Sequence, residues 1–222
     1  MRILHIADFH GAEHLYEWLS RECRSFDLVA LSGDLLNLNQ NRPIGDQIDR
    51  VLSHLKKVTA PLALSSGNHD CVIGGWSQLE MATWLNGARR KNVWIDGDSF
   101  ELGGHRFTCI PWGGKLPDAG PEEIWLIHSP PDDAPTAISR GGADWGSFEF
   151  GELCRNRKGP WLALSGHVHD PQSWRAKLGR TWSLNPGCPD RAARPNHIVI
   201  DFKRGVAVRN QASGETDFFK LS

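Results

Sequence analysis

This sequence has neither an excess of charge of either sign nor any long apolar run. Its 25 Lys and Arg residues nearly balance 26 Asp and Glu residues, which leaves a formal net charge of -1. An overall basic field that would attract nucleic acid or a membrane surface is therefore excluded, so any such binding has to be local. No apolar run approaches the roughly 18 residues that suggest a membrane span, and the first residues are too short an apolar stretch for a signal peptide. We expect a cytoplasmic protein that does not bind membranes.

Cysteine is scarce and shows no paired pattern. The chain has five cysteines, widely spaced and without a Cys-x-x-Cys pair, at Cys23, Cys71, Cys109, Cys154 and Cys188. An odd, scattered set argues against a disulfide framework and against a thiolate zinc site, and indicates reduced thiols. The 222 residues, 40% of them hydrophobic, are enough for one well-packed core. With no repeat or convincing linker, we expect a single domain over residues 1–222.

Histidine and tryptophan are unusually frequent, with ten residues of each. Imidazole is the commonest metal ligand in proteins and the usual proton carrier at physiological pH. The tryptophans are scattered rather than striped, so core packing is the expected role for most of them. Trp112 and Trp145, which lie beside glycines, are the exceptions that we consider as ligand-stacking residues.

The first half of the chain alternates apolar runs with helical patterns. Residues 2–7, 27–32 and 61–64 are short apolar runs, and residues 12–23 and 43–58 place apolar side chains on one helical face. Runs that are apolar on both sides predict parallel strands buried between layers. Because functional residues in open α/β sheets lie at the carboxyl ends of the strands, we expect the site on one rim.

The second half has a different texture. Short runs at 93–95, 100–102 and 106–110 are separated by Asp-Gly and Gly-Gly, which favours hairpins and more antiparallel pairing. Residues 148–157 have a helical pattern, and the tail after residue 173 has the spacing of short strands. The segment 112–146 is rich in glycine and proline; it is expected to be loop that either overhangs the site or is an uninvolved surface excursion.

Polar residues that can bind metal ions follow these apolar runs. Seven of them are candidate ligands: Asp8, His10, Asp34, Asn68, His128, His167 and His169. Carboxylate, imidazole and amide groups suit manganese, iron, zinc, cobalt or nickel rather than a thiolate-preferring ion. Seven candidates exceed the three or four protein ligands of one catalytic ion, which favours two ions, and a carboxylate can bridge ions about 3.5–4 Å apart.

Each piece also has an ordinary structural interpretation. Asp8 can cap a helix, Asp34 can belong to a turn after Gly33, and His128 can be a hydrogen-bonded core histidine. Two imidazoles in Gly166-His167-Val168-His169 alone are a weak signal. The pieces together, in this order and each ending an apolar run, are poorly explained by chance.

The combination resembles the calcineurin-like metallophosphoesterases, in particular their small bacterial and archaeal phosphodiesterase-like members. The family pattern D-x-H, G-D, G-N-H-D/E, H and G-H-x-H is matched by Asp8/His10, Gly33/Asp34, Gly67–Asp70, His128 and Gly166–His169. The resemblance spans residues 3–190. It implies an α/β fold, a four-layer αββα sandwich of two mixed β-sheets flanked by helices.

The resemblance also implies roles for the candidate residues. One metal ion would take Asp8, His10, Asp34 and His169, and the other Asp34, Asn68, His128 and His167, so that Asp34 is the bridge. A metal-bridging hydroxide would be the nucleophile, with His69 as general acid. Asp70 could orient His69 as a second catalytic residue, or it could be a turn residue. Manganese is the first expectation for both ions, with iron, zinc, nickel and cobalt as alternatives.

The expected function is a dinuclear metal-dependent phosphoesterase that hydrolyses phosphodiester bonds. The alternatives are a phosphomonoesterase that uses the same site and a non-catalytic scaffold that binds metal for structure. The chain has no basic stripe, so we expect a small phosphoester substrate and no polymeric DNA. Lys115, Arg140 and Arg191 are cations that could contact a phosphate, or else solvated surface charges. The physiological substrate and the oligomeric state stay open.

Overall fold

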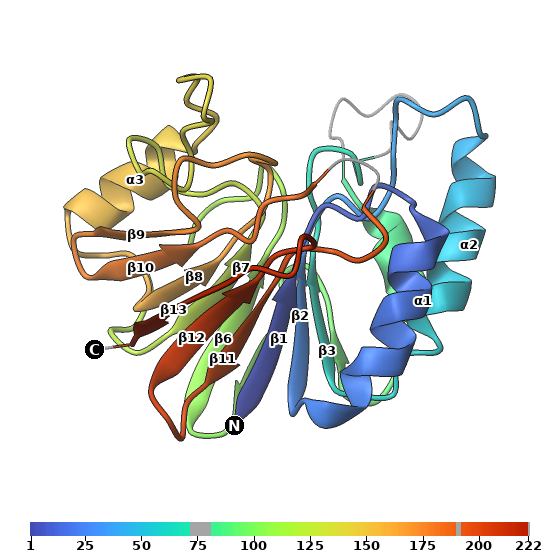
Figure 1. The fold of residues 1–222 in the computed structure, drawn as a ribbon, viewed down its shortest axis with the longest axis horizontal. Helices are drawn as coiled ribbons and strands as arrows, with labels where there is room; N and C mark the ends of the chain where they lie inside the picture. The colour runs from blue at the N-terminus through green and yellow to red at the C-terminus, as the bar shows by residue number, and fades with distance from the viewer. Residues whose placement is uncertain (72–80, 190–191, 222) are drawn as a thin grey trace.

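Two β-sheets packed face to face form the centre of the molecule in the computed structural model, which describes residues 1–71, 81–189 and 192–221 (Figure 1). The strands of the first sheet are β1 (Arg2–Ile6), β2 (Leu28–Ser32), β3 (Leu62–Ser65), β4 (Val93–Trp94), β11 (His197–Asp201), β12 (Val206–Asn210) and β13 (Thr216–Lys220). Those of the second are β5 (Ser99–Leu102), β6 (His105–Ile110), β7 (Ile124–Ile127), β8 (Leu162–Leu164), β9 (Arg175–Leu178) and β10 (Thr181–Leu184). In the described part of the chain the strand orders are β13-β12-β11-β1-β2-β3-β4 and β5-β6-β7-β8-β10-β9.

Three α-helices of the described residues cover the outer faces of the sheets. They are α1 (Glu13–Glu22), α2 (Ile44–Leu55) and α3 (Phe148–Arg155), and two short 3-10 helices are η1 (Cys23–Ser25) and η2 (Thr83–Ala88). Ser147 caps α3, since its Oγ accepts a hydrogen bond from the backbone N–H of Phe150 at 3.3 Å. None of the described helices has the length and apolar content that crossing a bilayer requires.

Alternation along β1 explains why both faces of the first sheet are covered. Leu4 and Ile6 belong to the core between this sheet and helices α1 and α2, whereas Ile3 belongs to the core between the two sheets. A third core, which includes Trp125 and Phe150, lies between the second sheet and α3. The layer order is therefore helix, sheet, sheet, helix, which confirms the expected αββα sandwich (Figure 1).

Strand direction differs in part from the sequence expectation. Strands β1, β2, β3 and β4 pair in parallel, as predicted for the first three. The expectation of more antiparallel pairing in the second half holds, but the hairpin interpretation does not extend to every strand there, because β6-β7, β7-β8 and β8-β10 are parallel. The Asp96-Gly97 turn carries the chain from one sheet to the other instead of closing a hairpin. Antiparallel pairing holds for β5-β6, β9-β10 and β11-β12-β13.

Candidate metal centre

The expected ligands lie in the loops that follow five parallel strands. Asp8 and His10 follow β1, Asp34 follows β2, and Asn68 follows β3. The other three come from the second sheet: His128 follows β7, and His167 and His169 follow β8. Since parallel strands present their carboxyl ends at one edge, both sheets deliver these loops to the same rim (Figure 1).

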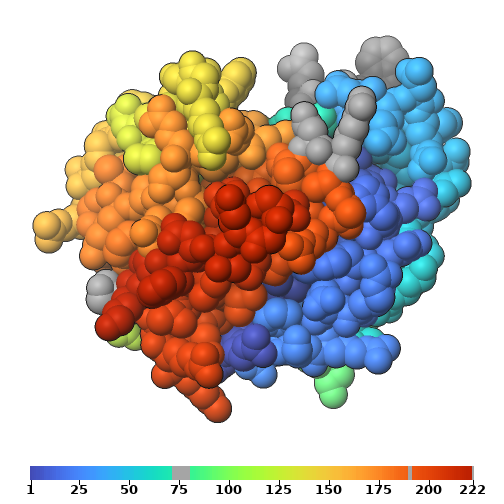
Figure 2. Space-filling model, viewed as in Figure 1, coloured from blue at the N-terminus to red at the C-terminus, as the bar shows by residue number. Residues whose placement is uncertain are grey.

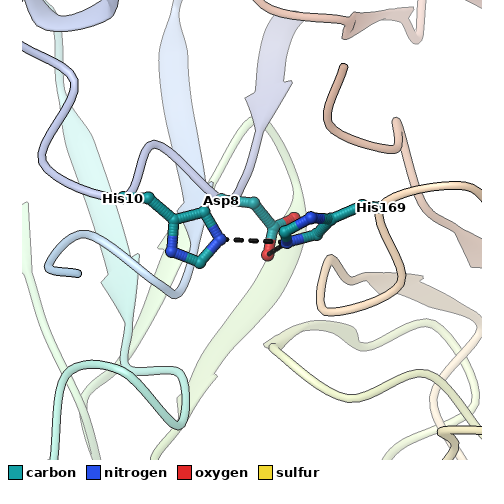
Figure 3. A group of neighbouring side chains, drawn as sticks. All are labelled: Asp8, His10 and His169. Carbon is teal, nitrogen blue, oxygen red and sulfur yellow. Dashed lines mark hydrogen bonds and ion pairs between the residues drawn. The ribbon is translucent and has the colours of Figure 1, made fainter. Parts of the chain in front are cut away.

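Asp8, His10 and His169 form the first cluster, drawn in Figure 3. Nε2 of His10 lies 2.9 Å from Nε2 of His169, and the two rings meet edge to edge at an interplanar angle of 62° with Asp8 beside them (Figure 3). Oδ1 of Asp8 is 3.9 Å from Nε2 of His169 and accepts a hydrogen bond from the backbone N–H of His167 at 3.1 Å. One carboxylate and two imidazoles thus converge on a common point.

Asp34, His128 and His167 form the second cluster. Oδ2 of Asp34 lies 3.3 Å from Nε2 of His128 and 3.8 Å from Nε2 of His10. Asp34 therefore reaches toward both clusters. Nδ1 of His128 lies 2.7 Å from the carbonyl oxygen of Ser32, and donating to that carbonyl leaves the lone pair on Nε2 for the site.

Backbone geometry at the rim is unusual. Four of the seven non-glycine residues with positive φ in the described ranges are candidate ligands: Asp8, His10, Asp34 and His167. Such conformations cost free energy and persist where the surrounding structure fixes them, often at functional sites. A Cβ on Gly67 would collide with the Asp34 carboxylate and the His128 ring, so glycine is required for these side chains to approach.

The charges of the cluster shift one another's protonation. Burial by itself would lower the pKa of His128, but the carboxylates of Asp34 and Asp8 outweigh it and raise the pKa to about 9. Burial would raise the pKa of Asp34, but His128 and the backbone N–H of His69 hold it below its usual range. Burial dominates at Asp8 and raises its pKa. The ionised carboxylate of Asp34 is therefore balanced by the proton on His128, and a divalent cation at this place would supply the same positive charge in its stead.

The other imidazoles are shifted toward their neutral form. Burial lowers the pKa of His10, and burial together with the neighbouring His128 lowers the pKa of His167 to about 4. Neutral imidazole is the form that coordinates metal ions.

Buried polar atoms without hydrogen bonds mark the same place. Four such atoms belong to candidate ligands: Oδ2 of Asp8, Nδ1 of His10, Oδ1 of Asn68 and Nε2 of His128. Unsatisfied buried polar atoms are rare and costly in folded proteins. Oδ1 of Asn68 and Nε2 of His128 offer lone pairs, and Asp8 offers a carboxylate, so the donor set fits hard or borderline divalent cations.

His69 and Asp70 occupy different environments. The backbone N–H of His69 donates to Oδ1 of Asp34 at 2.8 Å, and its Nδ1 accepts from the backbone N–H of Leu38 at 3.1 Å. Its ring centroid is 4.7 Å from that of His10. Asp70 accepts from the backbone N–H groups of Gly67 and Leu36 at 2.9 Å each. Its carboxylate therefore holds the turn, the alternative that the sequence left open, rather than the ring of His69.

Two separate cavities border the rim, each at different candidate ligands. The first, of about 410 Å³, is lined by Asp8, His10, His69 and His169 and continues to His14, Asn39 and Arg194. The second, of about 340 Å³, is lined by His128 together with Trp112 and Trp145, and we call it the tryptophan cavity. The segment 112–146 thus borders the site, although β7 divides it into two loops.

Several residues near the rim were missed from sequence. His14, Asn39 and Arg194 carry no motif, and only the fold brings them to the first cavity. Arg140 is an exposed residue that pairs with Asp170 at 3.1 Å, and Lys115 borders a separate cavity beside Gly97. Arg191 lies outside the described residues.

Comparison with solved structures supports the fold. The phosphoesterase YfcE from E. coli aligns over all of both chains, with a TM-score of 0.52 and 14% identity. The purple acid phosphatase PPD1 from yellow lupin seeds aligns over 99% of this chain and 53% of its own, with a TM-score of 0.63 and 15% identity. The NAD nucleotidase NadN from Haemophilus influenzae aligns over 99% of this chain and 49% of its own, with a TM-score of 0.50 and 11% identity.

No sequence match was found among curated proteins. The family model described as calcineurin-like phosphoesterase matches residues 1–171. That match spans the five rim loops that carry the candidate ligands. The chain belongs to the calcineurin-like phosphoesterase family.

Proposed function

We propose that this chain is a dinuclear metal-dependent phosphodiesterase. The observation that carries the proposal is that two separate cavities border different candidate ligands. A phosphodiester has two organic arms, and both need space beside the reacting phosphorus. The first cavity meets the rim at His10 and His169, and the tryptophan cavity meets it at His128. Each cavity can therefore take one arm.

The distribution of positive charge also favours a diester. Arg194 is the one lysine or arginine among the described residues that line the two cavities. A monoester dianion carries one more negative charge than a diester and needs more cationic partners beside the metal ions. The single arginine fits the diester monoanion better.

The candidate ligands have defined roles in this proposal. Asp8, His10 and His169 would hold one divalent ion, Asn68, His128 and His167 the other, and Asp34 would serve both. When bound, two divalent ions supply Lewis-acid charge to the phosphoryl oxygens and lower the pKa of the attacking water. The donor chemistry suits manganese, iron, zinc, cobalt or nickel, and manganese is the ion that we expect first.

His69 would donate a hydrogen bond to the substrate. Because Nδ1 accepts the Leu38 N–H, the neutral ring carries its proton on Nε2. Action as a general acid would require a second ring proton at Nδ1 and loss of that hydrogen bond. The role that fits this geometry is a hydrogen-bond donor to a non-bridging phosphoryl oxygen, in place of the general acid that the family resemblance implies.

A comparison of two nitrophenyl esters tests the proposed function. The chelated protein would be supplied singly with Mn²⁺, Ni²⁺, Co²⁺, Zn²⁺ or Mg²⁺ and assayed on bis-p-nitrophenyl phosphate and p-nitrophenyl phosphate. We expect faster cleavage of the diester with a transition metal. Faster cleavage of the monoester would make the protein a phosphatase, and no cleavage with any metal would point to a scaffold.

A further inference from the structure

The tryptophan cavity begins at a candidate metal ligand and has aromatic walls. His128 lies at one end, and Trp112 and Trp145 line it from the loops that follow β6 and β7. Its volume of about 340 Å³ falls within the roughly 300–1,000 Å³ of ligand pockets. A group that fills it would lie next to His128, a candidate ligand.

Trp112 is held in place against the candidate ligands. Its ring centroid is 5.6 Å from that of His128 and 5.3 Å from that of His167. Its backbone N–H donates to Oγ of Ser66 at 2.9 Å. This indole is therefore a fixed wall of the cavity that lies beside His128 and His167.

Trp145 is exposed, yet its backbone is ordered. The side chain is 58% exposed, whereas its backbone N–H donates to the carbonyl of Ala137 at 3.1 Å and its carbonyl accepts from Oγ of Ser129 at 3.2 Å. Asp144 adds two bonds, to the backbone N–H groups of Asp133 and Gly146 at 2.8 Å each. The loop projects from the surface as the yellow segment of Figure 2. A large aromatic side chain presented on a preformed loop beside a site is suited to binding a ligand.

The charge of the cavity selects among ligands. Glu149 is the one charged side chain besides His128 among the described residues that line it, and none is lysine or arginine. A second phosphate or a carboxylate would meet a negative charge and no positive partner. An uncharged planar group would lose little hydration free energy on entering this cavity and would gain stacking on an indole ring.

We propose that the tryptophan cavity binds a nucleobase on one arm of the substrate, which makes the substrate class nucleoside phosphodiesters. This inference rests on the proposed function, because it assigns one of the two arms. The other arm would lie in the first cavity, beside Arg194 and His14. Trp145 would act as a specificity-determining residue that stacks on the base and does not touch the reacting atoms.

The test compares two ligands that differ only by the base. Adenosine 5′-monophosphate and ribose 5-phosphate would be titrated into the full chain loaded with Mn²⁺, and their dissociation constants measured by calorimetry. We expect the adenosine compound to bind about tenfold more tightly, within the range that stacking of one base on one aromatic side chain supplies. Equal affinities would overturn the proposal.

Three variants locate the difference. Trp145→Ala should remove most of the tenfold preference, Trp145→Phe should keep most of it, and ribose 5-phosphate should bind unchanged to both. Phe148→Ala is the matched control, because Phe148 is 70% exposed next to the same loop but does not line the cavity. Retention of the preference in Trp145→Ala, or an equal loss in Phe148→Ala, would contradict the assignment.

The calorimetric comparison does not require turnover. Failure of the nitrophenyl ester assay would remove the proposed phosphodiesterase activity while leaving the base preference measurable. Hydrolysis of the nitrophenyl diester without any base preference would remove the nucleobase site alone.

Discussion

The backbone N–H of Leu38 donates to Nδ1 of His69 at 3.1 Å, so a loop residue fixes the tautomer of the histidine beside the candidate metal centre. Leu38 is 47% exposed, and it contributes to the site through its backbone N–H and not through its side chain. No side-chain pattern could indicate this bond. Its consequence is that the neutral His69 ring offers a hydrogen on Nε2.

Replacement of His69 tests this tautomer. His69→Ala should lower kcat by about 10²-fold, the scale of losing one preorganised donor to an oxyanion. Because a neutral donor stabilises charge without giving up its proton, the loss should be similar for methyl p-nitrophenyl phosphate and for a dialkyl phosphate with a poor leaving group. A loss much larger on the poor leaving group would show that His69 is a general acid after all.

Gln47 is predicted to position His69 through the Leu38 loop. Its buried amide accepts from the N–H of Asn37 at 3.0 Å and donates to the carbonyls of Asn37 and Arg42 at 3.1 Å each. Gln47→Met should reduce the free energy of unfolding by about 1–3 kcal/mol, the cost of leaving buried polar groups unpaired. It should also lower kcat in the wild-type chain but not in His69→Ala, as a double-mutant cycle would measure. The same loss of kcat in both backgrounds would contradict the positioning role.

Asp34 is predicted to matter more than any ligand of a single cluster. Asp34→Asn should lower the number of Mn²⁺ ions bound per chain and should lose activity beyond the roughly 10–100-fold that losing a group supporting a ligand costs. Asn68→Ala is the matched comparison, because it removes an amide oxygen from one cluster and leaves Asp34 in place. Elemental analysis measures the metal content of both variants. A near-wild-type metal content and rate for Asp34→Asn would contradict the bridging assignment.

His5 should make folding stability depend on pH. This residue is fully buried between the sheets, and burial lowers its pKa from 6.5 to about 3. Below pH 6.5 the unfolded chain binds a proton at His5 that the folded chain does not. The free energy of unfolding is therefore highest above pH 6.5 and decreases as the pH falls toward 3. His5 alone should change the free energy of unfolding by up to about 1.4 kcal/mol per pH unit in this range.

The variant His5→Gln isolates that contribution. It cannot titrate, so its free energy of unfolding should fall less steeply between pH 6.5 and 4.5 than that of the wild type. Urea unfolding at several pH values gives both slopes, and the carboxylates contribute equally to the two proteins. Identical slopes would mean that His5 is protonated in the folded state.

The candidate ligands could be found from sequence because each ends a strand. Apolar runs buried on both faces end abruptly where Asp8, Asp34 and Asn68 begin, and parallel strands carry such ends to one edge. Tertiary partners could not be found this way. Arg194 and His14 come from segments far apart in the chain that only the assembled first cavity brings together.

Strand partners could be predicted from the sequence less well than the candidate ligands. Asp96-Gly97 has the composition of a hairpin turn, but its neighbours β4 and β5 belong to different sheets. A short turn signal fixes the local bend and not the partner of the next strand, which is chosen by burial in the assembled core. The same limit applies to Asp70, whose carboxylate binds two backbone N–H groups that the sequence cannot place around it.

The central claim is that two ions shared by Asp34 catalyse phosphodiester cleavage. The most direct measurement is a titration of the chelated chain with Mn²⁺ while hydrolysis of bis-p-nitrophenyl phosphate is followed and bound metal is counted. The account predicts that full activity is reached when two ions are bound per chain. Full activity with one bound ion, or two bound ions without cleavage of the diester, would contradict it.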